Sequence, residues 1–128
     1  MKDTTLYLLH IVECIGKIER YAEMGRAGLA DDALIFDAVL RNLQTLSEAT
    51  QRLPQDLIER HPGIPWKRIA GFRNILVHDY LGGIDPPVVW TIVRTELPIL
   101  KGAILTELPD RPSVRQATIS DSAEPDTP

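Results

Sequence analysis

Apolar residues recur every three or four positions along most of the chain, and this spacing constrains the fold more than any other feature. An α-helix has about 3.6 residues per turn, so residues spaced in this way form one stripe along a helix. The first such row predicts an amphipathic helix from about Asp3 to Met24. Strict alternation of apolar and polar residues, which is typical of strands, is absent over any useful length. The row consists of Leu8, Ile11, Val12, Ile15, Ile18 and Ala22.

A second long helix is expected after a break at Gly25 and Gly28. Either Asp31 or Asp32 can cap its first turn, and Pro54 ends it, with a short turn of helix up to Arg60. One row along this helix consists of Phe36, Val39, Leu40, Leu43, Leu46, Thr50 and Leu53. A largely apolar row of this length predicts a long antiparallel partner helix.

A further helix is expected to begin at Pro65, after a loop at 61–65, because proline suits the first position of a helix. Gly71 lies opposite its core-facing row and permits close approach by another helix. The two faces available for burial predict a homodimer. The core-facing row is Trp66, Ile69, Phe72 and Leu76, and the opposite row is Gly71, Asn74, Ile75 and His78.

Pro86 and Pro87 open the last helix, and Pro98 within it should kink the rod about one turn earlier. Residues 1–108 are therefore expected to form one all-α domain, an up-down bundle of about five helices. Residues 109–128 contain four of the ten prolines and few apolar residues, so we expect a disordered tail. The inward residues of the last helix are Val89, Trp90, Val93, Leu97, Leu100 and Ile104.

Charge and cysteine content exclude several classes of function. The net charge is −4, so the chain is not a generally basic nucleic-acid coat, and any site for a polyanion must be a local cluster. Cys14 is the single cysteine and lies in an apolar stripe, which predicts a buried, inert thiol and a reducing compartment. The three histidines lack metal-ligand spacing, so neither a metal nor another cofactor is expected. Without a signal sequence or a membrane span, the expected location is cytoplasmic.

One segment combines the side chains that phosphodiester chemistry requires. Arg73, Asn74, His78 and Tyr80 lie within two helical turns. An arginine stays charged and can hold a phosphate in a bidentate fork, and a histidine both gives and takes protons near neutral pH.

The spacing within this segment makes two polar ridges rather than one. At about 100° per residue, the five-residue step from Arg73 to His78 places them on different sides of a straight helix. Arg73 shares a side with Tyr80, and Asn74 shares one with His78. The ridges can meet if the helix ends near His78, as Leu81-Gly82-Gly83 suggests, or if a second copy packs across it.

The segment closely resembles the HepT family of HEPN-domain toxin ribonucleases. The resemblance rests on the segments Trp66–Ile69 and Arg73–Tyr80, followed by Val89-Trp90 and Glu96-Leu97-Pro98. It extends back through His61-Pro62 and Glu48-Ala49 to the segment Val39–Leu43, and covers roughly residues 3–108.

The resemblance implies an all-helical, HEPN-like homodimer whose two motif helices line a shared cleft that cuts RNA without metal. It also implies a MntA-like nucleotidyltransferase antitoxin that silences the toxin by adding AMP to Tyr80. Arg73, His78 and Tyr80 match the arginine, histidine and tyrosine of the family motif, and Asn74 matches the polar residue that often follows the arginine.

The residues themselves suggest how such a cleft would act. His78 can take the proton from an RNA 2′-hydroxyl, which attacks the adjacent phosphorus and leaves a cyclic phosphate and a 5′-hydroxyl. Arg73 would offset the charge on the phosphoryl oxygens, while Asn74 and Tyr80 would orient the reacting groups. Two other interpretations stay open: a non-catalytic dimeric adaptor or nucleotide-binding partner of a nucleotidyltransferase, and a buried polar network that fixes the dimer register.

Three further cations could bind RNA. Lys67 and Arg68 lie one turn before Arg73 and could extend a positive track, although a basic pair at a helix start can also be merely solvated. Arg41 could add phosphate-binding charge while Glu48 orients an arginine across the cleft. The alternative for Arg41 and Glu48 is a solvated helix face with internal ion pairs.

Overall fold

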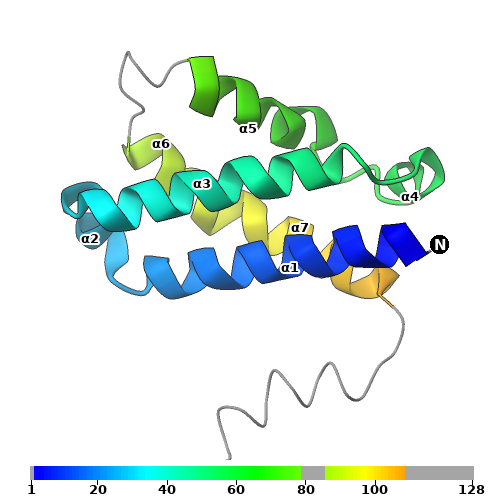
Figure 1. Ribbon diagram of the computed structural model, residues 1–128, viewed down its shortest axis with the longest axis horizontal. Coiled ribbons are helices and arrows are strands. Elements are labelled where there is room, and N and C mark those ends of the chain that lie inside the picture. Colours follow the sequence, from blue (N-terminus) through cyan, green and yellow to red (C-terminus); the bar gives the residue numbers. More distant parts are fainter. Residues whose placement is uncertain (1, 79–85, 109–128) are drawn as a thin grey trace, which may run out of the picture.

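A long helical hairpin forms the centre of the protein in the computed structural model, which describes residues 2–78 and 86–108 (Figure 1). Helices α1 (Lys2–Ala22) and α3 (Ala33–Thr50) run antiparallel, and α2 (Gly25–Asp31) lies between them in the chain. Then follow α4 (Gln55–Glu59), α5 (Trp66–His78), and a rod made of α6 (Pro86–Thr91), the π-helical segment η1 (Ile92–Glu96) and α7 (Leu97–Glu107). The described residues contain no strand, which confirms the all-α prediction.

The core lies where α1, α3 and the rod meet, with Ile69 and Phe72 of α5 completing it. The predicted apolar rows supply most of it, and Phe36, Trp66, Trp90, Val12 and Ala22 are only partly buried. Two polar residues inside the core, Ser47 and Thr50, satisfy their hydroxyls by donating to backbone carbonyls within α3. Among the described residues, no helix is long and apolar enough to cross a membrane.

The link between α1 and α3 differs in part from the prediction. Gly25 has a φ of +83°, a conformation that favours glycine, and it is the first residue of α2, just after the turn that ends α1. Gly28 does not break a helix, because it lies inside α2, where a Cβ would come within 2.6 Å of the Met24 Cβ. The cap of α3 is Asp32, whose Oδ1 accepts hydrogen bonds from the backbone N–H groups of Leu34 and Ile35.

The expected kink before Pro98 takes the form of the π-helical segment. Proline has no N–H to donate to the carbonyl four residues earlier, so a regular α-helix cannot continue through this position unchanged. The chain accommodates this in η1, where the N–H of Leu97 bonds to the carbonyl of Ile92 with one extra residue in the turn. The irregular turn therefore lies just before Pro98, in the region where the kink was expected.

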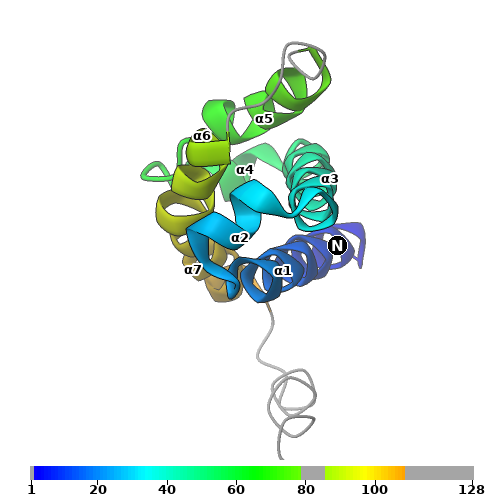
Figure 2. The same ribbon diagram turned by 90° about the vertical axis from the view of Figure 1, so that its left-hand side faces the viewer.

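Helix α5 lies at the edge of the molecule. It packs chiefly on α3, and the end-on view in Figure 2 shows it outside the α1–α3–α7 bundle. Among the α5 residues whose side chains are described, Ile69 and Phe72 are buried, and Ile64 in the preceding loop is buried as well. The helix on which the sequence motif lies is therefore held by one main neighbour.

Candidate functional site

The backbone of α5 is helical through Arg73, Asn74 and His78. A regular helix places residues five apart at about 140° around its axis, so the backbone agrees with the expectation that Arg73 and His78 belong to different ridges. The side chains of residues 73–78 lie outside the described part of the structure. Tyr80, with the rest of residues 79–85, lies outside it entirely.

The two predicted RNA-binding residues at the start of α5 have different surroundings. Lys67 is exposed. Arg68 is also exposed, but its Nε lies 2.7 Å from Oε2 of Glu96 in η1, so its charge is partly offset. Lys67 is therefore the more available of the two for an external phosphate.

Glu96 was not among the residues nominated from the sequence. Its side chain is 13% exposed, and its second oxygen, Oε1, is buried without a hydrogen-bond partner among the described residues. The sequence signal for it was present, because Glu96-Leu97-Pro98 belongs to the family resemblance. No chemistry could be assigned to Glu96 without knowing that η1 faces the first turns of α5.

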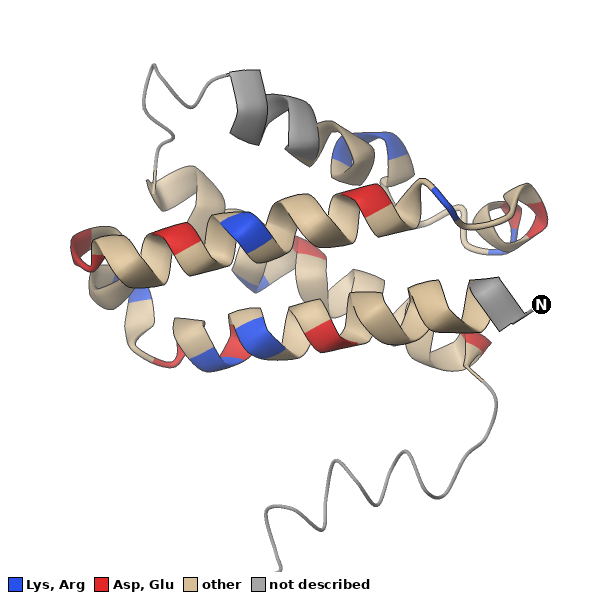
Figure 3. Cartoon of the chain, in the orientation of Figure 1, with Lys and Arg blue, Asp and Glu red and all other residues tan. Residues whose placement is uncertain are grey.

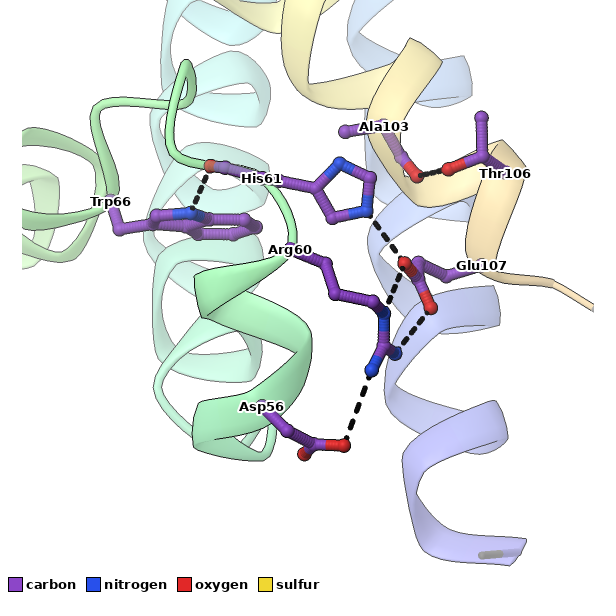
Figure 4. Close-up of polar contacts among 7 residues, drawn as sticks. All are labelled: Asp56, Arg60, His61, Trp66, Ala103, Thr106 and Glu107. Carbon is purple, nitrogen blue, oxygen red and sulfur yellow. Dashed lines mark hydrogen bonds and ion pairs between the residues drawn. The ribbon is translucent and has the colours of Figure 1, made fainter.

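A polar network holds the chain where α4 passes into α5 (Figure 4). Arg60 donates through Nε and Nη2 to both carboxylate oxygens of Glu107 at 3.1 and 2.7 Å, and through Nη1 to Asp56. Nε2 of His61 lies 2.6 Å from Oε2 of Glu107, and since an ionised carboxylate only accepts, this nitrogen carries the hydrogen. The indole N–H of Trp66 donates to the carbonyl of His61 at 2.9 Å. The network therefore joins the start of α5 to the end of α7.

The contacts within this network shift the pKa values of its charged groups. Hydrogen bonds from Arg60, and secondarily from His61, lower the pKa of Glu107 to about 2. The hydrogen bond to Glu107, and secondarily the one to Asp56, raises the pKa of Arg60. His61 has a structural role in this network. The network joins residues 56–66 to the distant Glu107, a contact that periodicity alone does not predict.

On α3, Arg41 and Glu48 are both exposed. They are seven residues apart and so lie on one side of the helix. Figure 3 shows basic and acidic residues mixed along α1 and α3 rather than a continuous basic face, in keeping with the expectation that the chain is not a generally basic nucleic-acid coat.

Cys14 is buried, as predicted. Burial raises the pKa of its thiol above its usual value, with Lys17 acting in the opposite direction, so the thiol is a poor nucleophile. Its Sγ lies 3.8 Å from Nε2 of His10. In the part of the chain that the structure describes, no group of histidine, cysteine and acidic residues is arranged to hold a metal ion.

Comparison with known proteins assigns the family. The model of the family described as "Ribonuclease HepT-like" matches residues 11–106, which include all of α5 and all of the rod except its last residue, Glu107. The chain belongs to the HepT-like ribonuclease family. The resemblance noted in the sequence is thereby confirmed.

Several curated relatives of this HepT-like chain share about a third of its residues. A candidate RNase from Caldanaerobacter subterraneus subsp. tengcongensis is 35% identical over 102 residues, covering 79% of this chain and 90% of that protein. A protein named "Probable ribonuclease HepT" from Thermococcus cleftensis is 37% identical over 97 residues, covering 75% and 87%.

A third relative is a larger protein. It comes from Methanocaldococcus jannaschii, is named as a gamma-glutamylcyclotransferase and candidate RNase, and is 36% identical over 105 residues. The match covers 81% of this chain but only 47% of that protein, so the HepT-like chain spans about half its length. No solved structure matches the chain.

Proposed function

We propose that this chain is a metal-independent endoribonuclease and the toxin of a toxin–antitoxin pair. The observation that carries the proposal is the segment Arg73–Tyr80, which contains a complete set of phosphodiester-cleaving side chains and lies within the family match. The position of α5 at the edge of the bundle supports it, because a long RNA strand can reach a helix there.

In the proposed reaction, His78 accepts the proton of the RNA 2′-hydroxyl as the 2′-oxygen bonds to the adjacent phosphorus. The bond from phosphorus to the 5′-oxygen breaks, and that oxygen takes a proton from an imidazolium or from water. The products are a 2′,3′-cyclic phosphate and a 5′-hydroxyl. General base catalysis contributes about 10²–10⁴-fold in such reactions. Arg73 stabilises the charge on the non-bridging oxygens, which is usually the larger effect, and Asn74 and Tyr80 orient the phosphate.

The proposal includes a homodimer. Arg73 and His78 belong to different ridges of one helix, so a second α5 packed across the first would bring a guanidinium of one copy to an imidazole of the other. Helix α5 has one main neighbour, α3, and Gly71 on the row opposite its core-facing side has open space where a Cβ would be. Both features leave room for a partner helix.

We further propose that Lys67 and Arg41 contact RNA phosphates at the edges of the cleft, with a smaller part for Arg68 because of its pairing with Glu96. A MntA-like nucleotidyltransferase antitoxin would add AMP to Tyr80 and so fill the cleft with a nucleotide. Incubation of the purified chain with such an enzyme and ATP, followed by mass measurement of the Tyr80 peptide, tests this step. An unmodified Tyr80 would contradict it.

The test of the nuclease is cleavage of RNA by the purified chain in the presence of EDTA, with the new ends identified chemically. His78→Ala and Arg73→Ala should abolish cutting, whereas the control His10→Ala, which changes an exposed histidine on α1, should not. A folded wild-type dimer that binds a nucleotidyltransferase but leaves RNA intact would favour the adaptor instead. If the protein does not cut RNA and fails to fold when Arg73, His78 or Tyr80 is replaced, the interpretation of these residues as a structural polar network would be favoured.

A further inference from the structure

The ion pair between Arg68 and Glu96 connects the first turns of α5 to the rod. Arg68 is 59% exposed, whereas Glu96 is 13% exposed. Nε of Arg68 lies 2.7 Å from Oε2 of Glu96, and the two residues are 28 positions apart in sequence. Together with the bond from Trp66 to the His61 carbonyl, it holds the start of α5 at two points.

Stability alone gives a poor reason for a glutamate at this position. Burying a carboxylate costs free energy. The attraction between Glu96 and Arg68 offsets only part of this cost, because Arg68 is exposed and solvent screens its charge. The buried Oε1 adds a further cost, because it has no partner among the described residues. A residue that costs stability and is held in a well-defined contact is a candidate for a functional role.

The geometry of α5 supplies such a role. His78 is ten residues beyond Arg68, or about 15 Å along a helix. A tilt of α5 by only about 4° around Arg68 would therefore move the backbone at His78 by about 1 Å. Errors of this size at a reacting group can lower a rate by about 10²-fold.

The location of Glu96 fits this role as well. It is the last residue of η1, the π-helical turn that forms because Pro98 cannot donate a backbone hydrogen bond. Irregular turns of this kind are frequent at functional sites. The turn is enclosed on its inner side by the buried residues Ile92, Val93 and Leu97, so the carboxylate is presented from a fixed support.

We propose that Glu96 is a positioning residue, which sets the direction of α5 through Arg68 and thereby places Arg73 and His78 for RNA cleavage. The inference rests on the proposed nuclease function. It also means that Arg68 mainly binds Glu96 and contributes less to RNA binding.

The test compares Glu96→Met with Glu19→Gln. The first removes the pair while keeping the volume of the side chain. The second removes the pair between Lys101 of α7 and Glu19 of α1, which does not involve α5. Three properties are measured on each full-length protein: thermal stability, kcat and KM for RNA cleavage, and amide hydrogen exchange across residues 66–78.

For Glu96→Met we expect a melting temperature equal to or above that of the wild type, a kcat lowered about tenfold or more with little change in KM, and exchange in α5 faster by about threefold to tenfold. Glu19→Gln should leave all three unchanged. Glu96→Asp, which keeps the charge, should recover part of the lost kcat.

Two outcomes would overturn the proposal. If Glu96→Met lowers stability and activity together, Glu96 is simply a structural residue. If both kcat and α5 exchange stay at wild-type values, Glu96 does not position the helix. Should the wild-type chain fail to cut RNA, the nuclease proposal falls by itself, and unchanged α5 exchange in Glu96→Met would still overturn the positioning role.

Discussion

Replacing Glu107 with glutamine should weaken the protein at neutral pH but much less in acid. Glu107 accepts hydrogen bonds from Arg60 at 3.1 and 2.7 Å and from His61 at 2.6 Å, and its side chain is 15% exposed. Glutamine keeps the shape but removes the charge, and its amide N–H₂ cannot accept the bonds that the carboxylate oxygen accepts. The connection between the end of α7 and the start of α5 should therefore loosen.

The magnitude follows from the pKa. The pKa of Glu107 falls from 4.5 to about 2 on folding, which corresponds to a stabilisation of about 3 kcal/mol. Arg60 is half exposed, so solvent screens the pair, and we expect a measured loss of about 1–2 kcal/mol. For a domain of this size the melting temperature should drop by roughly 5–10 °C.

The pH dependence has a definite sign. The folded state holds Glu107 ionised at a pH where the unfolded chain already binds the proton, so the contribution is complete above pH 4.5 and is lost as pH falls toward 2. The difference in unfolding free energy between wild type and Glu107→Gln should therefore be largest at neutral pH, and more than half of it should be gone at about pH 3.

Urea unfolding followed by circular dichroism at several pH values measures this difference. Glu59→Gln is the matched control, because Glu59 lies on the neighbouring α4 and, within the described part of the chain, makes one exposed hydrogen bond, to Gln55. It should change stability by no more than about 0.5 kcal/mol. The claim that the ionised Glu107 carboxylate stabilises the fold would be refuted in two cases. The difference in unfolding free energy between wild type and Glu107→Gln would stay constant between pH 7 and pH 3, or it would be absent at pH 7.

Three further substitutions test the packing and the proposed RNA contacts. Gly28→Ala should destabilise the protein by about 1–3 kcal/mol, because the new Cβ meets the Met24 Cβ at 2.6 Å, and thermal melting will detect it; a stability equal to wild type would be inconsistent with this packing. Ile69→Ala should cost about 2–4 kcal/mol by opening a cavity between α3 and α5, measured in urea, and a loss below about 1 kcal/mol would argue against full burial. Arg41→Glu should weaken RNA binding and reduce its salt dependence; an unchanged salt slope would make Arg41 an ordinary surface residue.

The helices could be predicted from sequence because their causes are local. The three-and-four spacing identified the buried rows of α1, α3 and the rod, and the proline rule indicated an irregular turn before Pro98, where η1 lies. The short helix α2 was missed because a glycine usually weakens a helix. At Gly28 the lack of a side chain instead allows the close contact with Met24.

The polar contacts around α5 could not be predicted in the same way. Arg60 and Glu107 are 47 positions apart, and Arg68 meets Glu96 across a turn whose shape depends on Pro98. Such pairs depend on how whole helices pack, and periodicity does not specify that. The motif could be proposed from the sequence because its residue types and spacing suit phosphodiester chemistry, whereas the contacts that hold α5 in place became visible only in three dimensions.

The central claim is that the chain cuts RNA through attack by the 2′-hydroxyl. The most direct measurement uses two RNA strands that differ only by a 2′-deoxy sugar at the mapped cleavage position, incubated with the purified wild-type chain and EDTA. We predict cutting of the all-ribose strand with a cyclic phosphate end, and no cutting at the deoxy position. Cleavage of the deoxy strand at the same bond would contradict the mechanism.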